Sequence, residues 1–195
     1  SWLRIASEKM ESLVGGTQSL QIFIDMNEVD ALKNPEVLNK MNLLQEKLLN
    51  EHGDLIVRGM SLVNVVKHTN QILNVNREEM YQIPQDERAL GEVLFLFNNG
   101  NPEDRRSLVS DDYRKATINL SVRNTLFSKY QELIEIVETE KNQLFESLLK
   151  RYPEMVIKVT GPVVMEVHQE LYITKSLYRS FLLTIVVISM ILLFL

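Results

Sequence analysis

The sequence predicts an α+β fold in which a four-stranded antiparallel sheet carries two main helices on one face and a C-terminal helix enters a membrane. Two strand-helix-strand patterns, one in each half of the chain, predict the sheet and its helices. A helical stretch at about residues 61–100 separates the two patterns. An uninterrupted apolar run at residues 180–195 predicts the membrane helix.

Length and composition fit one folded domain with one membrane segment. The chain has 195 residues, of which 45% are hydrophobic and 24% are charged. A net charge of −5 provides no basic field for a phosphate backbone, so nucleic acid is not an expected partner. The chain contains no cysteine, which excludes disulfides, thiolate zinc sites and cysteine nucleophiles.

The first strand-helix-strand pattern follows a short lead-in segment. Residues 1–18 are expected to form a lead-in helix and a turn. Alternation from Leu20 to Asp25 predicts the first strand. Asn34 and Pro35 have the residue types preferred at the N-cap and first position of a helix, which predicts a helix from Pro35. A second strand is expected at residues 55–59.

Residues 61–100 read as two helices inserted between the two halves. Ser61 is a suitable N-cap for the first of these helices. Ile83-Pro84 predicts an extended break, because the residue before a proline disfavours helical geometry. The second inserted helix is expected to end at Asn98-Asn99-Gly100.

The second half contains the clearest strand of the chain. After Asp111-Asp112, residues 115–122 alternate, with Ala116, Ile118, Leu120 and Val122 predicted to face inward. A long helix ending at Pro153 and a strand at Met155–Thr160 follow. The buried stripe of that helix is expected to comprise Tyr130, Leu133, Ile134, Val137, Leu144, Phe145 and Leu148, with Glu135, Glu138, Glu140 and Lys141 mostly elsewhere.

Taken in order, these elements predict a split β-α-β, or ferredoxin-like, arrangement. In that arrangement two β-α-β units contribute four strands to one antiparallel sheet and pack both helices on one face. The right-handed rule for crossovers between parallel strands favours this topology over its mirror image.

The apolar run Ser180–Leu195 contains no ionisable residue. About 20 apolar residues are needed to cross a bilayer, so we expect the helix to continue past the given sequence. The transmembrane helix is assigned to residues 175–195. Lys175, Tyr178 and Arg179 are expected at the membrane interface, where long cationic and aromatic side chains are favoured. The alternative is a core helix, which an all-round apolar surface disfavours.

Few residues in the sequence indicate a catalytic or metal-binding site. The histidines His52, His68 and His168 lack the spacing of metal ligands. Glu166, His168 and Glu170 alternate on an expected helix and therefore point in different directions. Asp111-Asp112 is interpreted as a solvated strand entry. The sequence accordingly predicts no catalytic residue, no metal site and no cofactor, and we do not expect an enzyme.

Several short motifs, in order and spacing, carry a family resemblance from about Gly15 onward. These are Gly15-Gly16-Thr17-Gln18-Ser19-Leu20, Asn34-Pro35-Glu36-Val37-Leu38, Gly59-Met60-Ser61-Leu62-Val63, Ile83-Pro84 and Thr160-Gly161-Pro162. Together they resemble the MMPL-like, hydrophobe-exporting branch of the RND superfamily of exporters. The chain departs from the pattern at Asn64, where an acidic residue is expected.

The resemblance implies that residues 19–174 are an extracytoplasmic porter domain and that residues 175–195 begin the second transmembrane helix of a larger pump. Thr160, Gly161 and Pro162 would join the domain to that helix. Family members use the proton motive force to move lipids or other hydrophobic compounds across the bacterial inner membrane. The implied partners are such a substrate, the bilayer and the remainder of the transporter chain, with a homo-oligomer left open.

Two other function classes compete with this interpretation. The first is a tail-anchored extracytoplasmic binding or sensor domain, with residues 180–195 serving only as an anchor. The second is a membrane-tethered enzyme, which the missing catalytic constellation disfavours. The flanking Lys175 and Arg179, taken alone, would place their side of the membrane in the cytoplasm, whereas the porter interpretation places residues 1–174 outside it.

Overall fold

The computed structural model describes residue 16 and residues 18–194. The predicted lead-in helix lies outside these residues. The strands are β1 (Gln18–Asp25), β2 (Ile56–Met60), β3 (Lys115–Val122) and β4 (Val156–Thr160). The helices are η1 (Ala31–Lys33), α2 (Pro35–Glu51), α3 (Leu62–Leu73), η2 (Glu78–Met80), α4 (Glu87–Asn98), α5 (Pro102–Arg106), α6 (Phe127–Arg151) and α7 (Pro162–Phe194), where η1 and η2 are 3-10 helices.

The four strands form one antiparallel sheet in the order β2-β3-β1-β4. β1 pairs along its whole length with β3, from Gln18 opposite Val122 to Asp25 opposite Lys115. On its other side β1 pairs with β4. The predicted α+β class with a four-stranded antiparallel sheet and a C-terminal apolar helix is therefore confirmed.

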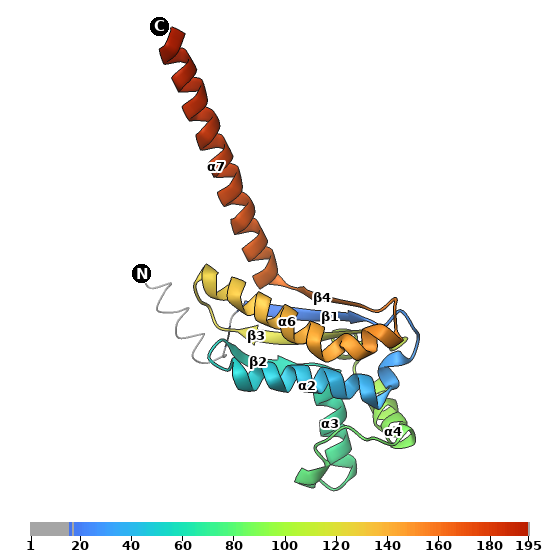
Figure 1. The fold of residues 1–195 in the computed structure, drawn as a ribbon. Coiled ribbons are helices and arrows are strands. Elements are labelled where there is room, and N and C mark those ends of the chain that lie inside the picture. Colours follow the sequence, from blue (N-terminus) through green and yellow to red (C-terminus); the bar gives the residue numbers. More distant parts are fainter. Residues whose placement is uncertain (1–15, 17, 195) are drawn as a thin grey trace.

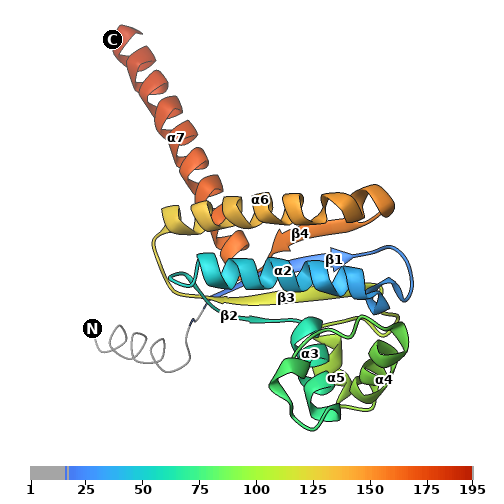
Figure 2. The same ribbon diagram turned by 60° about the horizontal axis from the view of Figure 1, so that its bottom comes forward.

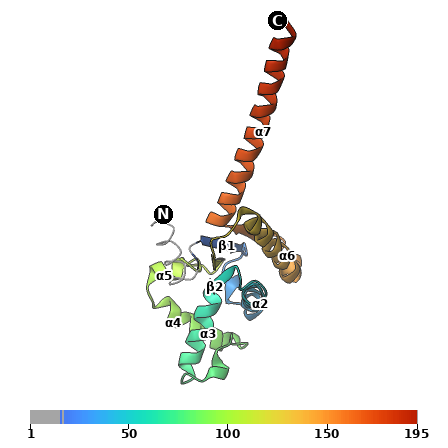
Figure 3. The ribbon, with the colours of Figure 1, turned by 90° about the vertical axis from the view of Figure 1, so that its left-hand side faces the viewer.

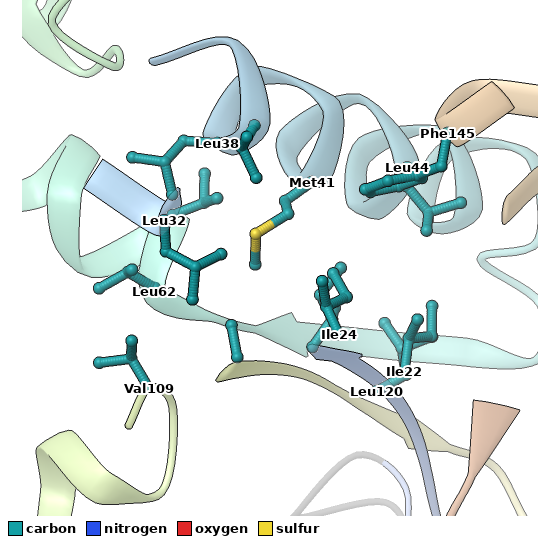
Figure 4. Close-up of a cluster of buried hydrophobic side chains, with 14 of the residues drawn as sticks. Ile22, Ile24, Leu32, Leu38, Met41, Leu44, Leu62, Val109, Leu120 and Phe145 are labelled. Atoms are coloured by element: carbon teal, nitrogen blue, oxygen red, sulfur yellow. The ribbon is translucent and has the colours of Figure 1, made fainter. Parts of the chain in front are cut away.

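Helices α2 and α6 lie side by side over one face of the sheet and enclose the main core (Figures 2 and 3). Leu20, Ile22 and Ile24 of β1 are fully buried beneath them, as the period of two predicts. Figure 4 shows Ile22 and Leu120 from the sheet with Met41 and Leu44 of α2 above them. Burial of these aliphatic side chains is the main stabilising contribution, at roughly 1.5 to 3 kcal/mol for each fully buried residue.

The predicted helix starts follow the expected local chemistry. Asn34 is the N-cap of α2, and its side-chain oxygen accepts a hydrogen bond from the backbone N–H of Glu36 at 2.8 Å. Pro35 occupies the first helical position, where its missing N–H costs nothing. In β3, the four residues predicted to face inward are all buried.

Lys141 of α6 differs from expectation. The sequence pattern placed it among the polar residues, but its side chain is buried between α6 and β4. Its ammonium group donates hydrogen bonds to the Glu138 carboxylate and to the carbonyl of Ile157. The aliphatic part of the lysine side chain packs in the apolar stripe, and its ammonium group extends to hydrogen-bond acceptors. Amphipathic periodicity alone does not predict that a lysine is buried in this way. Ile134 and Leu144 of the predicted stripe are only partly buried.

The helical insert follows the edge strand β2 and comprises α3, η2, α4 and α5. Its last helix, α5, lies beyond the predicted border near residue 100. Leu62, Ile83 and Leu90 are buried and join the cluster formed by the sheet and α2. The insert projects from the side of the body opposite to the free part of α7 (Figures 1 and 2).

An ion pair joins the end of β1 to the residue before β3, at the end of the sheet near the insert. The Arg114 guanidinium donates to both Asp25 carboxylate oxygens, at 2.7 and 3.2 Å. These hydrogen bonds lower the pKa of Asp25 below its ordinary value of 3.8, although partial burial opposes them. The Asp25 side chain is only 15% exposed, so solvent screens the pair less than a surface ion pair.

We expect Asp25→Asn to make folding less stable at pH 7 and less sensitive to acid. Because the folded-state pKa of Asp25 is lowered, its contribution is present above about pH 4 and is lost as the pH falls through that lowered pKa. Urea unfolding followed by circular dichroism at pH 7, 5 and 3 measures both effects. Glu146→Gln, which removes an exposed α6 pair with Lys150, is the control and should change stability less. Equal acid sensitivity of wild type and Asp25→Asn would contradict the assignment.

Candidate functional site

The candidate site is the junction at which the sheet passes into α7. Thr160 ends β4, Gly161 turns the chain, and Pro162 is the first residue of the helix. Gly161 has φ +104°, a conformation that side chains rarely adopt. A Cβ atom there would lie 3.1 Å from the Ser19 carbonyl oxygen and 3.2 Å from the Gln21 nitrogen. The predicted junction residues therefore form a tight turn against β1.

A short apolar contact holds the start of α7. Val163, Val164 and Val167 are buried, at 0, 9 and 5% exposure, and α7 contacts β1, β4 and α6 in this region. Beyond Val167 every described side chain of α7 is exposed. The helix is thus anchored over its first turn and a half and then leaves the body (Figures 1 and 3).

The free part of α7 is long and apolar enough to cross a membrane, judged by length and composition. The helix has 33 residues, which at 1.5 Å per residue extend about 50 Å. None of its most apolar stretch is buried within the structure. A helix that is apolar all round and unburied is compatible with membrane anchoring and does not resemble a core helix of this domain.

The three predicted interface residues all lie exposed on α7, and their spacing of three and four residues places them on one side of the helix. Lys175 and Arg179 line a shallow groove on the helix together with Tyr172 and Ser176. Tyr178 lies in a second shallow groove, with Leu177 and Phe181 among its neighbours. The cationic and aromatic groups therefore lie within about one turn of each other on that side, and their position at a membrane interface stays a prediction.

Glu166, His168 and Glu170 do not converge. They follow one another at two-residue spacing on α7, so successive members lie on opposite sides of the helix. Over the part of the chain that is described, no group of three or more His, Asp or Glu side chains could hold a metal ion. The structure therefore does not bring these three side chains together.

A buried polar network joins the insert to the body, and Ser61 is at its centre. The Ser61 hydroxyl donates to the Gln45 side-chain oxygen at 2.7 Å. Asn64 accepts from the Ser61 backbone N–H at 2.9 Å and from the Gln45 amide at 3.0 Å. Asn64 thus completes a capping box for α3.

A second contact, one turn along α3, was not predicted from the sequence. Lys67 is 8% exposed and donates to Asn42 at 2.9 Å and to Glu46 at 3.0 Å, both on α2. Its ammonium also lies 4.9 Å from the ring centre of Tyr81. One sequence signal could have revealed these contacts: Gln45 and Lys67 each stand within an otherwise apolar helix stripe. A polar group buried at such a position needs a hydrogen-bond partner.

Comparisons with protein-family models, curated proteins and solved structures give no match to this chain.

We expect Gly161→Ala to destabilise the sheet domain by about 1 to 3 kcal/mol, because the added Cβ meets backbone atoms of β1 and the positive φ becomes strained. Gly91→Ala is the matched control. Gly91 lies within α4, and a Cβ there meets nothing within 4 Å, so the change should stabilise by about 0.5 to 1 kcal/mol.

Urea unfolding at low protein concentration, where intramolecular contacts dominate, compares the two glycine variants. Similar midpoints for Gly161→Ala and wild type would show that the turn at Gly161 is not under the proposed constraint.

Proposed function

We propose that the chain is the extracytoplasmic porter domain and following membrane helix of an RND-superfamily exporter, of the MMPL-like branch that moves lipids or other hydrophobic compounds. The order of elements supports this assignment. Two strand-helix-strand units with the sheet order β2-β3-β1-β4 fit the expected ferredoxin-like porter fold. The motifs that carry the resemblance lie at element starts and turns, including Asn34-Pro35 and Gly161-Pro162.

The observation that carries the proposal is the continuity of α7. One helix begins in contact with the sheet at Val163 and extends without interruption through Leu193 in its apolar part. The predicted border at residues 174 and 175 falls within this helix. A movement of the membrane helix would therefore reach the sheet without passing through a flexible linker.

Under this proposal the domain performs no bond chemistry. It moves as a rigid body and thereby opens or closes part of the route of an apolar substrate. The proton motive force would act through ionisable groups in other membrane helices, because residues 180–195 contain none. Lys175, Tyr178 and Arg179 would mark the interface of the bacterial inner membrane, with residues 1–174 on the extracytoplasmic side.

A tail-anchored binding or sensor domain is the second candidate. The observation in its favour is that a single helix of the described chain is long and apolar enough to span a membrane. The coding sequence downstream of Leu195 discriminates between the two. Several further apolar spans, one of them with a buried acidic residue, would support the exporter, whereas an immediate stop codon would support the anchor.

Insertion of two glycines after Val167 in the complete protein should abolish most transport, because it breaks the helix between its sheet anchor and its membrane part. We expect efflux of a lipophilic fluorescent dye from cells to fall at least tenfold. Two glycines inserted after Gly100, in the exposed segment between α4 and α5, are the matched control and should leave efflux unchanged. Both proteins should retain the wild-type circular dichroism spectrum. Unaltered efflux after the insertion at Val167 would overturn the proposed coupling.

A further inference from the structure

The outer side of the insert carries an apolar patch that none of the described residues covers. The patch consists of Leu73 at the end of α3 together with Arg88, Gly91, Glu92, Phe95 and Leu96 of α4, which line a shallow groove of about 530 Å³. Phe95 is 65% exposed, and Leu73 and Leu96 are nearly half exposed. Large apolar side chains gathered on one exposed surface mark interaction sites.

Gly91 gives an independent indication that something approaches this patch closely. It lies in the interior of α4, where glycine costs roughly 0.5 to 1 kcal/mol relative to alanine. Nothing within the described structure requires it, because its φ is not positive and a Cβ atom would meet no atom within 4 Å. A glycine on the exposed face of a helix allows another backbone to pack against it at short distance.

The position of the patch selects a protein partner over a lipid surface. The insert lies on the side of the body opposite to the free part of α7 (Figures 1 and 3). A bilayer that contains α7 therefore cannot also cover the insert. Nucleic acid is disfavoured as well, because the patch carries one positive and one negative side chain and the chain has a net charge of −5.

The charges make the patch complementary to itself. Arg88 and Glu92 lie one turn apart on the same face of α4 and form a weak exposed pair, with a nitrogen-to-oxygen distance of 3.6 Å. A two-fold rotation presents each of these charges with the opposite charge of a second copy. In an antiparallel pair of α4 helices that cross near Gly91, Arg88 also comes beside the Phe95 ring of the second copy.

We propose that the insert is a homotypic contact site, at which α4 of one chain packs antiparallel on α4 of a second copy and crosses it at Gly91. The apolar area is small, so the contact is weak for chains free in solution. Anchoring by α7 in one membrane raises the effective concentration of the copies and favours pairing. This inference does not depend on the exporter assignment, because a sensor or a pump could use the same contact.

Cysteine crosslinking of the full 195-residue chain in liposomes tests the proposal. The chain has no cysteine, so Gly91→Cys introduces a single thiol at the expected crossing point. The structure has room for that side chain in one copy. Under mild oxidation we expect a covalent dimer to form at least fivefold faster than with Glu78→Cys, the control on an exposed part of the insert outside the patch.

Charge reversal in the Gly91→Cys background distinguishes the patch from association through α7. Arg88→Glu or Glu92→Arg alone places like charges opposite one another and should slow crosslinking by at least threefold. The double variant Arg88→Glu/Glu92→Arg restores opposite charges and should recover the rate. Circular dichroism checks that each variant is folded.

Three results would overturn the homotypic contact. The first is equal crosslinking of Gly91→Cys and Glu78→Cys, which indicates association elsewhere or none. The second is slower crosslinking that the double reversal does not recover. The third is crosslinking of Gly91→Cys only to a different protein when the chain is expressed in its native membrane. None of these results bears on dye efflux, so failure here leaves the proposed transport function untouched.

Discussion

The pairing of β1 with β3 on one side and β4 on the other is the constraint on which the rest of the structure depends. It leaves β2 and β4 as edge strands, and each edge strand is followed directly by a helix that leaves the sheet. The register places Met60, Asn119, Gln21 and Thr160 in one row across the sheet. That row connects the origin of the insert to the origin of α7 over three strand spacings, or about 14 Å.

The two departing helices are anchored in the same way. Leu62, Val63 and Val66 are buried at the start of α3, and Val163, Val164 and Val167 repeat this spacing at the start of α7. Their surroundings then differ. α3 acquires polar contacts with α2 and apolar contacts with α4, whereas α7 is exposed beyond its anchor. An apolar helix of that length requires lipid or other protein around it.

The sheet carries the long apolar helix α7 at one edge and the insert at the other, and under the proposed function it would transmit movement between them. Antiparallel pairing and the covering helices resist internal deformation, so under that proposal a tilt of α7 would displace the insert as well. The polar network of Gln45, Ser61 and Asn64 holds the insert against α2, because separating the two would leave buried polar groups without partners. The proposed pairing through α4 would then connect the movements of neighbouring copies.

The sequence by itself determined the order of the four strands and of the main helices, because each of these depends on local signals. Alternation in β1 and β3, the Asn34-Pro35 helix start and the unbroken apolar run after Arg179 are all readable within a few residues. Only the tertiary structure decided which polar groups are buried and which apolar ones are left exposed. Lys67 and Lys141 find their partners on other elements, and Phe95 faces outward, because packing between segments distant in the chain sets these environments. The candidate site divides in the same way: its turn at Gly161 is visible in the sequence, but the contact of that turn with β1 arises from strand pairing.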